Sequence, residues 1–355
     1  MMIRIIILCL ALMLPISGRA DVPRVILGPE QSTETIRIVG DADIPQFTPV
    51  LEAFAERNPG LRIEYESPTT ADIFANAIVD CTTGAPGPHA ILSSSVHKLV
   101  DLVNRNCAQR YRSAITQRLP DSLRWRDEVW GFSREPVVFA YNTEYFSEST
   151  VPNTRLELLE KLDGPAALTA KDIVTHNMPI VELSYLLVML DLNQTSTLAS
   201  LIEAFGAGSA TLLGSTAAML DGVAEGRFKL AYNALGSYAA ARAAQDPRIG
   251  ILEPKDFTTV LSRSVIVPKS APSRALGTRF VDFLLSDDGQ RVLTEQSFRN
   301  RPIAFDQDDN EVVATADRLV ALSPALILAN DAQKRAHLLA LWNAAFRHRN
   351  TYPDM

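Results

Sequence analysis

The sequence predicts an α/β protein whose mostly parallel β-sheets are divided between two lobes. Short β-rich runs alternate with helical patterns along most of the chain, as they do in βαβ units. A chain of 355 residues is longer than one ordinary domain, so two lobes are expected. An apolar content of 47% with 21% charged residues is typical of a globular protein and not of a disordered one.

The first βαβ unit is the clearest. Residues 35–39 are β-rich, and the acidic turn 40–43 follows them. Apolar residues then recur with helical spacing over 47–55, and Asn-Pro-Gly at 58–60 ends this helix. Residues 61–65 alternate between apolar and polar, as in a strand. The first strand-to-helix loop of such a unit usually faces a ligand crevice.

The same alternation continues through the rest of the chain. Strands are predicted at 90–92, 136–141, 166–169, 228–232 and 264–267, with a loop at 233–237. Helices are predicted at 96–106, 216–225, 275–285, 288–296 and 331–347. The runs 136–141 and 251–267 are the best candidates for crossing between lobes. We therefore expect residues 21–133 and 252–355 to form lobe 1 and residues 134–251 to form lobe 2.

Residues 1–20 have the pattern of an export signal. Arg4 precedes an apolar run over 5–14, and Gly18 and Ala20 provide small residues for cleavage after Ala20. An N-terminal membrane anchor is the alternative, but the apolar run is too short to span a bilayer. The pattern therefore predicts a periplasmic protein. Cleavage removes Arg4 and Arg19 and no acid, so the net charge changes from −7 to −9.

Two of the 3 cysteines, Cys81 and Cys107, lie beyond the signal. In an oxidising compartment an even pair favours a disulfide, and two separate buried thiols are the alternative. The acidic net charge argues against a nucleic-acid partner.

Catalytic signatures are mostly missing from the sequence. It contains no G-x-S-x-G, G-x-x-x-x-G-K-[ST] or H-E-x-x-H motif, and no two histidines have metal-ligand spacing. Gly206-Ala207-Gly208 resembles part of a dinucleotide fingerprint, but a helix C-cap explains it better. Asp41 and Asp43 could act as an acid/base pair, although this spacing in a turn more often holds the loop. We therefore predict no cofactor, no metal and no catalytic residue.

Small polar residues stand where predicted strands end and helices begin. Ser93, Ser94 and Ser95 precede one helix, and Ser215 and Thr216 open another. Free N–H groups and the positive dipole end favour an anion at such positions, whereas plain N-capping is the simpler interpretation. Arg134 could offer a bidentate fork to a carboxylate or phosphate, or form an ordinary surface salt bridge.

Five segments in order resemble the periplasmic solute-binding proteins of ABC transporters, in particular the type II branch with ferric-ion, hexose-phosphate and phosphoglycerate binding proteins. They are 36–61, 93–100, 136–143, 221–233 and 286–290. The resemblance implies a two-lobed periplasmic binding protein type II fold with a hinge and an interlobe cleft that closes on its ligand. It also implies a monomer that delivers ligand to a membrane permease or reports to a sensor kinase.

One segment departs from the ferric-binding pattern, which has adjacent tyrosines after the strand that corresponds to 228–232. Residues 233–238 read Asn-Ala-Leu-Gly-Ser-Tyr, so only Tyr238 is left. Iron held by paired phenolates is therefore disfavoured. Gly236 and Ser237 instead form a loop that can approach a ligand closely and donate hydrogen bonds.

We therefore predict a periplasmic binding protein that captures a small phosphorylated or carboxylated organic anion for an ABC importer. Asp43 would accept a hydrogen bond from a ligand hydroxyl, as in a sugar phosphate. The predicted site comprises Asp43, Ser94, Ser95, Arg134, Ser215, Thr216, Gly236, Ser237 and Tyr238. The alternatives are a ligand sensor for a two-component histidine kinase, a ferric-ion binder using Asp43 and Tyr238, and an exported hydrolase using Asp41 or Asp43.

Overall fold

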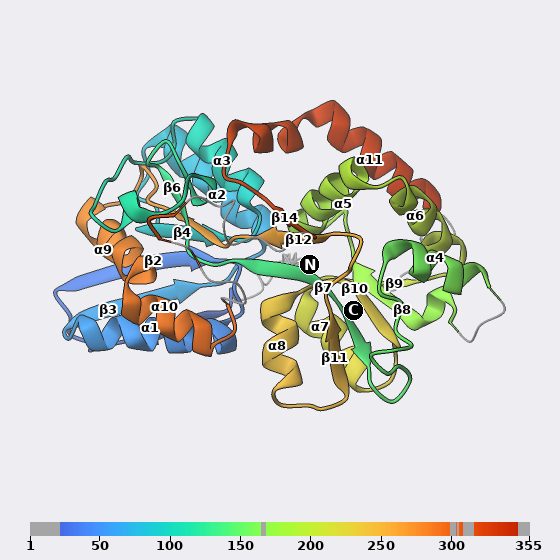
Figure 1. Ribbon diagram of the computed structural model, residues 1–355. Coiled ribbons are helices and arrows are strands. Elements are labelled where there is room, and N and C mark those ends of the chain that lie inside the picture. The colour runs from blue at the N-terminus through green and yellow to red at the C-terminus, as the bar shows by residue number, and fades with distance from the viewer. Residues whose placement is uncertain (1–21, 165–167, 299–302, 304, 308–315, 347–355) are drawn as a thin grey trace, which may run out of the picture.

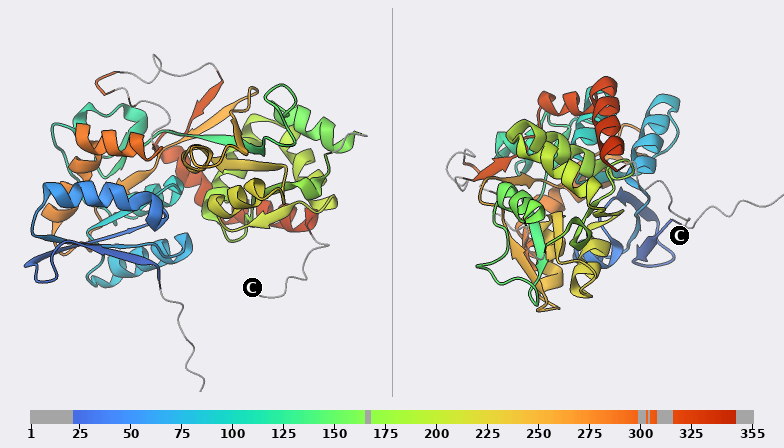
Figure 2. Two further views of the ribbon diagram at one scale, coloured as in Figure 1. Left: turned by 90° about the horizontal axis from the view of Figure 1, so that it is seen from below. Right: turned by 90° about the vertical axis from the view of Figure 1, so that its right-hand side faces the viewer.

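The computed structural model describes residues 22–164, 168–298, 303, 305–307 and 316–346. The predicted signal at 1–20 and its cleavage after Ala20 lie outside the described residues. The chain forms two lobes side by side, each built on a seven-stranded sheet (Figures 1 and 2). The predicted two-lobed α/β class is confirmed. Among the described helices, none combines the length and the apolar character needed to cross a bilayer.

The sheet of lobe 1 is parallel where the first βαβ unit lies and antiparallel at both edges. Its strand order is β1 (Arg24–Leu27), β3 (Leu61–Glu66), β2 (Glu34–Gly40), β4 (Ala90–Ser93), β13 (Ser264–Ile266), β6 (Val129–Gly131) and β5 (Arg124–Trp125). The helices and short 3-10 turns of this lobe are α1 (Ile44–Arg57), α2 (Thr70–Thr83), α3 (Val96–Asn104), η1 (Thr116–Arg118), η2 (Asp121–Leu123), α9 (Arg274–Leu285) and α10 (Asp287–Glu295).

Helix α1 illustrates how the sequence determines the packing of helices in lobe 1. Its buried residues recur with helical spacing, and the ring of Phe54 packs 5.0 Å from Phe280 and 5.1 Å from Phe283 on α9. Asn58 ends the helix, and its side-chain amide donates to the Phe54 carbonyl (2.8 Å). This packing holds the N-terminus of α1, capped by Asp43, at the carboxyl end of β2.

The sheet of lobe 2 is centred on β7 (Glu135–Asn142), which pairs antiparallel with β10, β11 and β12. Its order is β14 (Asp317–Leu319), β12 (Thr258–Leu261), β7, β10 (Leu230–Leu235), β8 (Ile173–His176) and β9 (Thr211–Leu213), with β11 (Ile249–Leu252) also on β7. The helices are α4 (Arg155–Asp163), η3 (Ala170–Asp172), α5 (Glu182–Gln194), α6 (Thr197–Ala207), α7 (Thr216–Ala224) and α8 (Gly236–Ala243).

Two predicted elements of lobe 2 differ from the structure. No strand includes Leu168 or Thr169, because Thr169 forms a capping box with Asp172 and the strand begins only at Ile173. Residues 166 and 167 lie outside the described part of the chain. The predicted loop 233–237 is also wrong, since β10 continues to Leu235 through a bulge and α8 starts at the next residue. The C-cap interpretation of Gly208 is confirmed at the end of α6.

Two crossings of the chain form the hinge between the lobes. Residues 132–134 lead from β6 into β7, and Ser262 and Arg263 lead from β12 back to β13. The crossings are bonded together, because the Phe132 N–H donates to the Arg263 carbonyl and the Arg263 N–H donates to Ser133 Oγ, both at 2.8 Å. The return crossing therefore lies later than the boundary predicted at residue 252, because β12 pairs with the start of β7.

The C-terminal strap, residues 324–345, joins the lobes a third time. Its first part, η5 (Pro324–Asn330), packs on α3 of lobe 1, where the Asn330 side chain donates to the His97 carbonyl (2.8 Å). Its second part, α11 (Ala332–Ala345), packs on α6 of lobe 2, and Figure 1 shows the strap in red across the molecule. Residues 252–355 were assigned to lobe 1 from the sequence, but β12, β14 and α11 lie with lobe 2.

Cys81 and Cys107 are joined in the structure by a disulfide, with their Cα atoms 5.5 Å apart. Cys81 lies in the last turn of α2, and Cys107 follows α3. The bond therefore ties together two helices of lobe 1.

Candidate functional site

A cavity of about 100 Å³ lies between the lobes, and we call it the interlobe cavity. Lobe 1 and lobe 2 both contribute polar side chains to it, and Arg263 enters from the hinge. The lining residues are Asp41, Asp43, Thr70, Ser94, His176, Val181, Leu183, Gly214, Ser215, Thr216, Leu235, Tyr238 and Arg263.

Six of the described helices begin at this cavity. Lining residues stand at, or one or two residues before, the first residue of each of α1, α2, α3, α5, α7 and α8: Asp43, Thr70, Ser94, Val181, Thr216 and Leu235. The first turn of a helix carries N–H groups without intrahelical partners and a partial positive charge. The convergence of six such ends favours a negative group in the cavity.

Asp41 already places one carboxylate at the start of α3. It accepts hydrogen bonds from Ser93 Oγ (2.5 Å), from the Ser94 N–H (3.1 Å) and from Ser94 Oγ (3.2 Å). Its other strong neighbour is Arg263, whose Nη1 lies 3.2 Å from Asp41 Oδ1. The role of Asp41 is therefore to hold the cavity wall in place and to neutralise part of the charge of Arg263.

Arg263 is the buried cation of the site, with 1% of its surface exposed. Its Nε lies 3.0 Å from Glu135 Oε1, and its guanidinium carbon lies 5.1 Å from the centre of the Phe298 ring. Burial opposes its charge, but Glu135, Tyr238 and Asp41 together raise the pKa of Arg263 above its ordinary value. It therefore stays a cation at the point where the two lobes meet.

Asp43 and Tyr238 join the two lobes directly. The Asp43 N–H, at the start of α1, donates to Tyr238 Oη on α8 (3.1 Å). Burial raises the pKa of Asp43, while Arg263 and Tyr238 oppose that shift. Burial also raises the pKa of Tyr238, so its ring carries a neutral hydroxyl and not a phenolate.

A second interlobe contact lies beside the cavity at Glu182, between the lining residues Val181 and Leu183. Glu182 Oε2 lies 3.4 Å from Lys98 Nζ of lobe 1, and Arg335 of the strap binds both carboxylate oxygens at 2.8 and 2.9 Å. Burial opposes its charge, but His97, Lys98 and Arg335 lower the pKa of Glu182 to about 2. Together with the Asp43–Tyr238 bond, this contact joins the two lobes beside the cavity.

The lobe 2 wall contains a neutral histidine that the sequence analysis missed. His176 ends β8, and its Nε2 lies 3.1 Å from Thr216 Oγ1. Its Nδ1 is buried without a hydrogen-bond partner among the described residues. Burial lowers the pKa of His176 to about 4, so the ring is uncharged at neutral pH and can offer one polar atom to a ligand.

This shift predicts a pH dependence of stability. The unfolded His176 binds a proton below its ordinary pKa of 6.5, whereas the folded form resists protonation down to about pH 4. The free energy of unfolding should therefore fall by about 2 kcal/mol from pH 7 to pH 5 through this residue alone. Urea unfolding of wild type and His176→Gln across this range measures it, because the variant should show a flatter profile. Parallel profiles would contradict the assignment.

The structure separates the predicted site residues into two groups. Asp43, Ser94, Ser215, Thr216 and Tyr238 line the interlobe cavity. Ser215 also caps α7, since its hydroxyl accepts from the Ala218 N–H (3.2 Å).

The other predicted residues lie outside the lining. Ser95 is fully buried at the start of α3, and Arg134 is 3% exposed in the hinge. Ser237 turns away from the cavity and donates to Glu135 (2.5 Å), and Gly236 packs against Pro136. These four residues build the hinge and the lobe walls, a role that their positions at element ends could not reveal.

Sequence reasoning also missed Thr70, Gly214 and Arg263, and it considered Asp41 either as a catalytic acid or as a residue that holds the loop. Arg263 lies between two serines in a β-rich run, and an arginine in such a run is the signal that could have marked it. Among the described residues, no group of three or more His, Cys, Asp or Glu side chains could hold a metal ion.

Comparisons with known proteins show which family this chain belongs to. Residues 50–318 match the model of bacterial extracellular solute-binding proteins. A substrate binding protein of an ABC transporter from Agrobacterium tumefaciens is 29% identical over 93% of this chain and 100% of its own, with a TM-score of 0.86.

Two more distant structures share the fold. Iron-bound HitA from Pseudomonas aeruginosa is 14% identical over 88% of this chain and 99% of its own (TM-score 0.65). AfuA from Actinobacillus pleuropneumoniae with bound fructose-6-phosphate is 13% identical over 89% and 99% (TM-score 0.70). A comparison with curated protein sequences found no match. The family match covers most of the chain, so this protein belongs to the bacterial extracellular solute-binding proteins, which bind a solute for an ABC transporter and are not enzymes.

Proposed function

We propose that the protein captures a small organic anion in the interlobe cavity and delivers it to an ABC permease. The observation that carries this proposal is the convergence of six helix N-termini on one cavity that also contains the Arg263 guanidinium. Asp41 and Glu135 together carry more negative charge than Arg263 carries positive charge, so the helix ends must supply the attraction for the anion.

The cavity favours a ligand that also carries a hydroxyl group. Asp43 has a carboxylate in the lining whose pKa is raised by burial, and a ligand hydroxyl could share a hydrogen bond with it. The volume of about 100 Å³ is below the range of roughly 300–1,000 Å³ that drug-sized ligands occupy. We therefore favour a three- or four-carbon phosphate or hydroxy acid over a hexose phosphate.

Ferric ion is the weaker candidate, although HitA shares the fold. Tyr238 is the one tyrosine among the described residues that line the cavity, and burial holds its hydroxyl in the protonated form. A site for ferric ion would need several ionised oxygen ligands around the metal. The lining offers Asp41 and Asp43, but it also contains a buried arginine, whose positive charge disfavours a second cation.

We also propose that residues 1–20 direct export to the periplasm with cleavage after Ala20, and that the protein acts as a monomer. The Cys81–Cys107 disulfide supports export, because such bonds persist in oxidising compartments.

Thermal unfolding with a ligand panel tests the proposal. After partial unfolding and dialysis to remove carried-over ligand, the protein is mixed with three-carbon phosphates, hexose phosphates, di- and tricarboxylates, or ferric citrate. A ligand at about a hundred times its Kd should add roughly 2.7 kcal/mol, which raises the Tm by several degrees. A shift with the small anions supports the proposal, and a shift with ferric citrate alone would refute it.

Thr70→Val provides a sharper test of the site. Thr70 lines the cavity at the first residue of α2, and valine keeps the shape of its side chain while removing the hydroxyl. We expect this variant to bind the anion about tenfold more weakly, the cost of one lost hydrogen bond. Thr82→Val is the matched control, because Thr82 is exposed on the same helix outside the lining. Equal affinities of the two variants would place the ligand elsewhere.

A further inference from the structure

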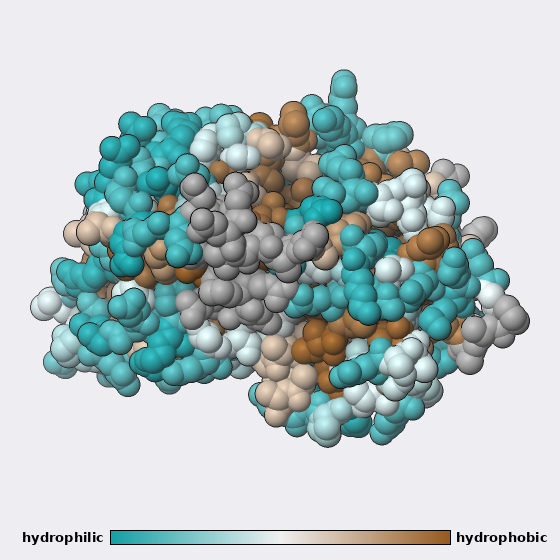
Figure 3. Space-filling model, viewed as in Figure 1, coloured by the Kyte–Doolittle hydropathy of each residue, from teal (hydrophilic) through white to brown (hydrophobic). Residues whose placement is uncertain are grey.

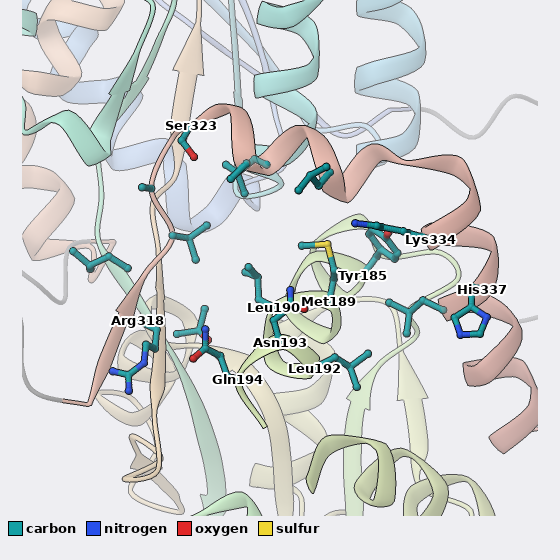
Figure 4. Close-up of a pocket in the computed structure, with 18 of the residues that line it drawn as sticks. Tyr185, Met189, Leu190, Leu192, Asn193, Gln194, Arg318, Ser323, Lys334 and His337 are labelled. Carbon is teal, nitrogen blue, oxygen red and sulfur yellow. The ribbon is translucent and has the colours of Figure 1, made fainter. Parts of the chain in front are cut away.

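A second cavity of about 790 Å³ lies between the C-terminal strap, α5 and the strands β12 and β14, and we call it the strap cavity (Figure 4). It shares no lining residue with the interlobe cavity. Its volume falls within the range of roughly 300–1,000 Å³ that small-molecule pockets occupy. The proposed anion capture between the lobes makes no use of it.

The walls of the strap cavity are largely apolar. Met189, Leu190 and Leu192 come from α5, and further leucines come from the strap. Two of these, Leu328 and Leu341, are 57% and 51% exposed. Figure 3 shows apolar surface in the hollow at the top of the molecule, beside the strap. Exposed apolar side chains that surround a concave surface usually mark a binding site.

The charged side chains that line the strap cavity have one sign. Arg318 and Lys334 line it together with the imidazole of His337, whereas no Asp or Glu does so within the described part of the chain. Figure 4 shows Lys334 and His337 on α11 at one end and Arg318 on β14 at the other. This bias is unexpected in a protein with a net charge of −7, and it is complementary to an anionic head group.

The wall also contains a buried hydroxyl. Tyr185 lines the cavity with none of its surface exposed, and its Oη has no hydrogen-bond partner among the described residues. Its ring lies beneath the Arg335 guanidinium, with the guanidinium carbon 4.5 Å from the ring centre. A buried tyrosine hydroxyl usually finds a partner, and a ligand oxygen at the Lys334 end could provide one.

We propose that the strap cavity binds a soluble amphiphilic anion, namely a single alkyl chain with one carboxylate. The leucines and methionine contact the chain, and Lys334 lies at the carboxylate end with the Tyr185 hydroxyl. A concave pocket closed by α5 on one side and α11 on the other suits one chain more than a flat membrane surface.

Calorimetric titration of the whole protein with dodecanoate, below its micelle concentration, tests this proposal. We expect saturable binding of one molecule, with dodecanol about tenfold weaker because it lacks the charge. Saturating the protein with an interlobe ligand found in the panel should leave dodecanoate binding unchanged. Competition between the two would overturn the proposal of a separate site without affecting the proposed anion capture.

Substitutions at exposed positions should leave the fold intact, and they separate the contribution of charge to dodecanoate binding from that of apolar contact. Lys334→Glu should weaken dodecanoate binding roughly fivefold or more, whereas Lys171→Glu, an exposed lysine outside the cavity, should not change it. Leu328→Gln with Leu341→Gln should weaken it at least tenfold, and Leu156→Gln, 54% exposed on α4, is the matched control. Equal binding by variants and controls, or binding only to anionic lipid vesicles, would refute the proposal.

Discussion

Replacing Arg263 with methionine should lower the free energy of unfolding by about 3–5 kcal/mol and abolish anion binding. Arg263 is 1% exposed and lies 3.0 Å from Glu135 and 3.2 Å from Asp41. Methionine keeps much of the packing against Phe298 but leaves two carboxylates without their cation. The hinge would then hold two largely buried carboxylates whose remaining partners, the serine groups that donate to Asp41 and Glu135, carry no charge. Urea unfolding and the ligand-induced Tm shift measure the two effects.

Two further variants show whether the loss of charge causes the loss of stability in Arg263→Met. Arg291→Met removes an arginine whose side chain is 60% exposed and paired with Glu295, and it should cost less than about 0.5 kcal/mol. Adding Glu135→Gln to Arg263→Met should recover part of the lost stability, because one unpaired carboxylate disappears. An Arg263→Met protein as stable as wild type would show that the ion pairs of Arg263 with Asp41 and Glu135 do not stabilise the hinge.

Replacing both cysteines with serine should lower the free energy of unfolding by about 3 kcal/mol. The bond between Cys81 and Cys107 closes a loop with a sequence separation of 26 residues, and its loss gives the unfolded chain more conformations. Both cysteines lie outside the interlobe cavity, so the affinity for the anion should not change. Denaturant unfolding and ligand titration of the double variant measure these expectations.

Reduction of the wild-type protein gives an independent comparison for the disulfide. A reducing agent should lower the stability of the wild type to that of Cys81→Ser with Cys107→Ser, and it should leave the double variant unchanged. If the reductant destabilised both proteins equally, the loss would have a cause other than this bond. A fall in affinity in the double variant would show that α2 and α3 need the bond to position Thr70 and Ser94.

Among the helices, one with a single buried face was predictable from the sequence, and one buried on most sides was not. Helix α1 buries Phe47, Val50, Leu51 and Phe54 along one face, and this spacing appears directly in the sequence. Helix α5 buries every residue from Leu183 to Val188, including Ser184. Its apolar run therefore lacks the alternation of apolar and polar residues at helical spacing. The sequence alone does not identify it as a helix, because its burial depends on packing with the rest of lobe 2.

The site residues also divide into those with a local signal in the sequence and those without one. Asp43, Ser94, Ser215 and Thr216 stand at helix starts, which are local features that a sequence displays. Arg263 reaches the cavity because β12 returns through the hinge, and His176 reaches it because β8 pairs with β10. These positions depend on strand order between distant segments, which local patterns do not encode.

The strap also determines the order in which the protein is completed. The chain builds lobe 1, then lobe 2, then lobe 1 again with α9 and α10, and of the described helices it reaches α11 last. A close approach at Gly206, where an added Cβ would lie 2.2 Å from the Ala345 carbonyl oxygen, shows how tightly α11 packs on α6. In a chain that emerges from its N-terminus onward, the apolar side of α6 stays uncovered until the final helix arrives. The second lobe therefore finishes after the first, and a chain stopped before residue 332 would have both crossings of the hinge but an open surface on α6.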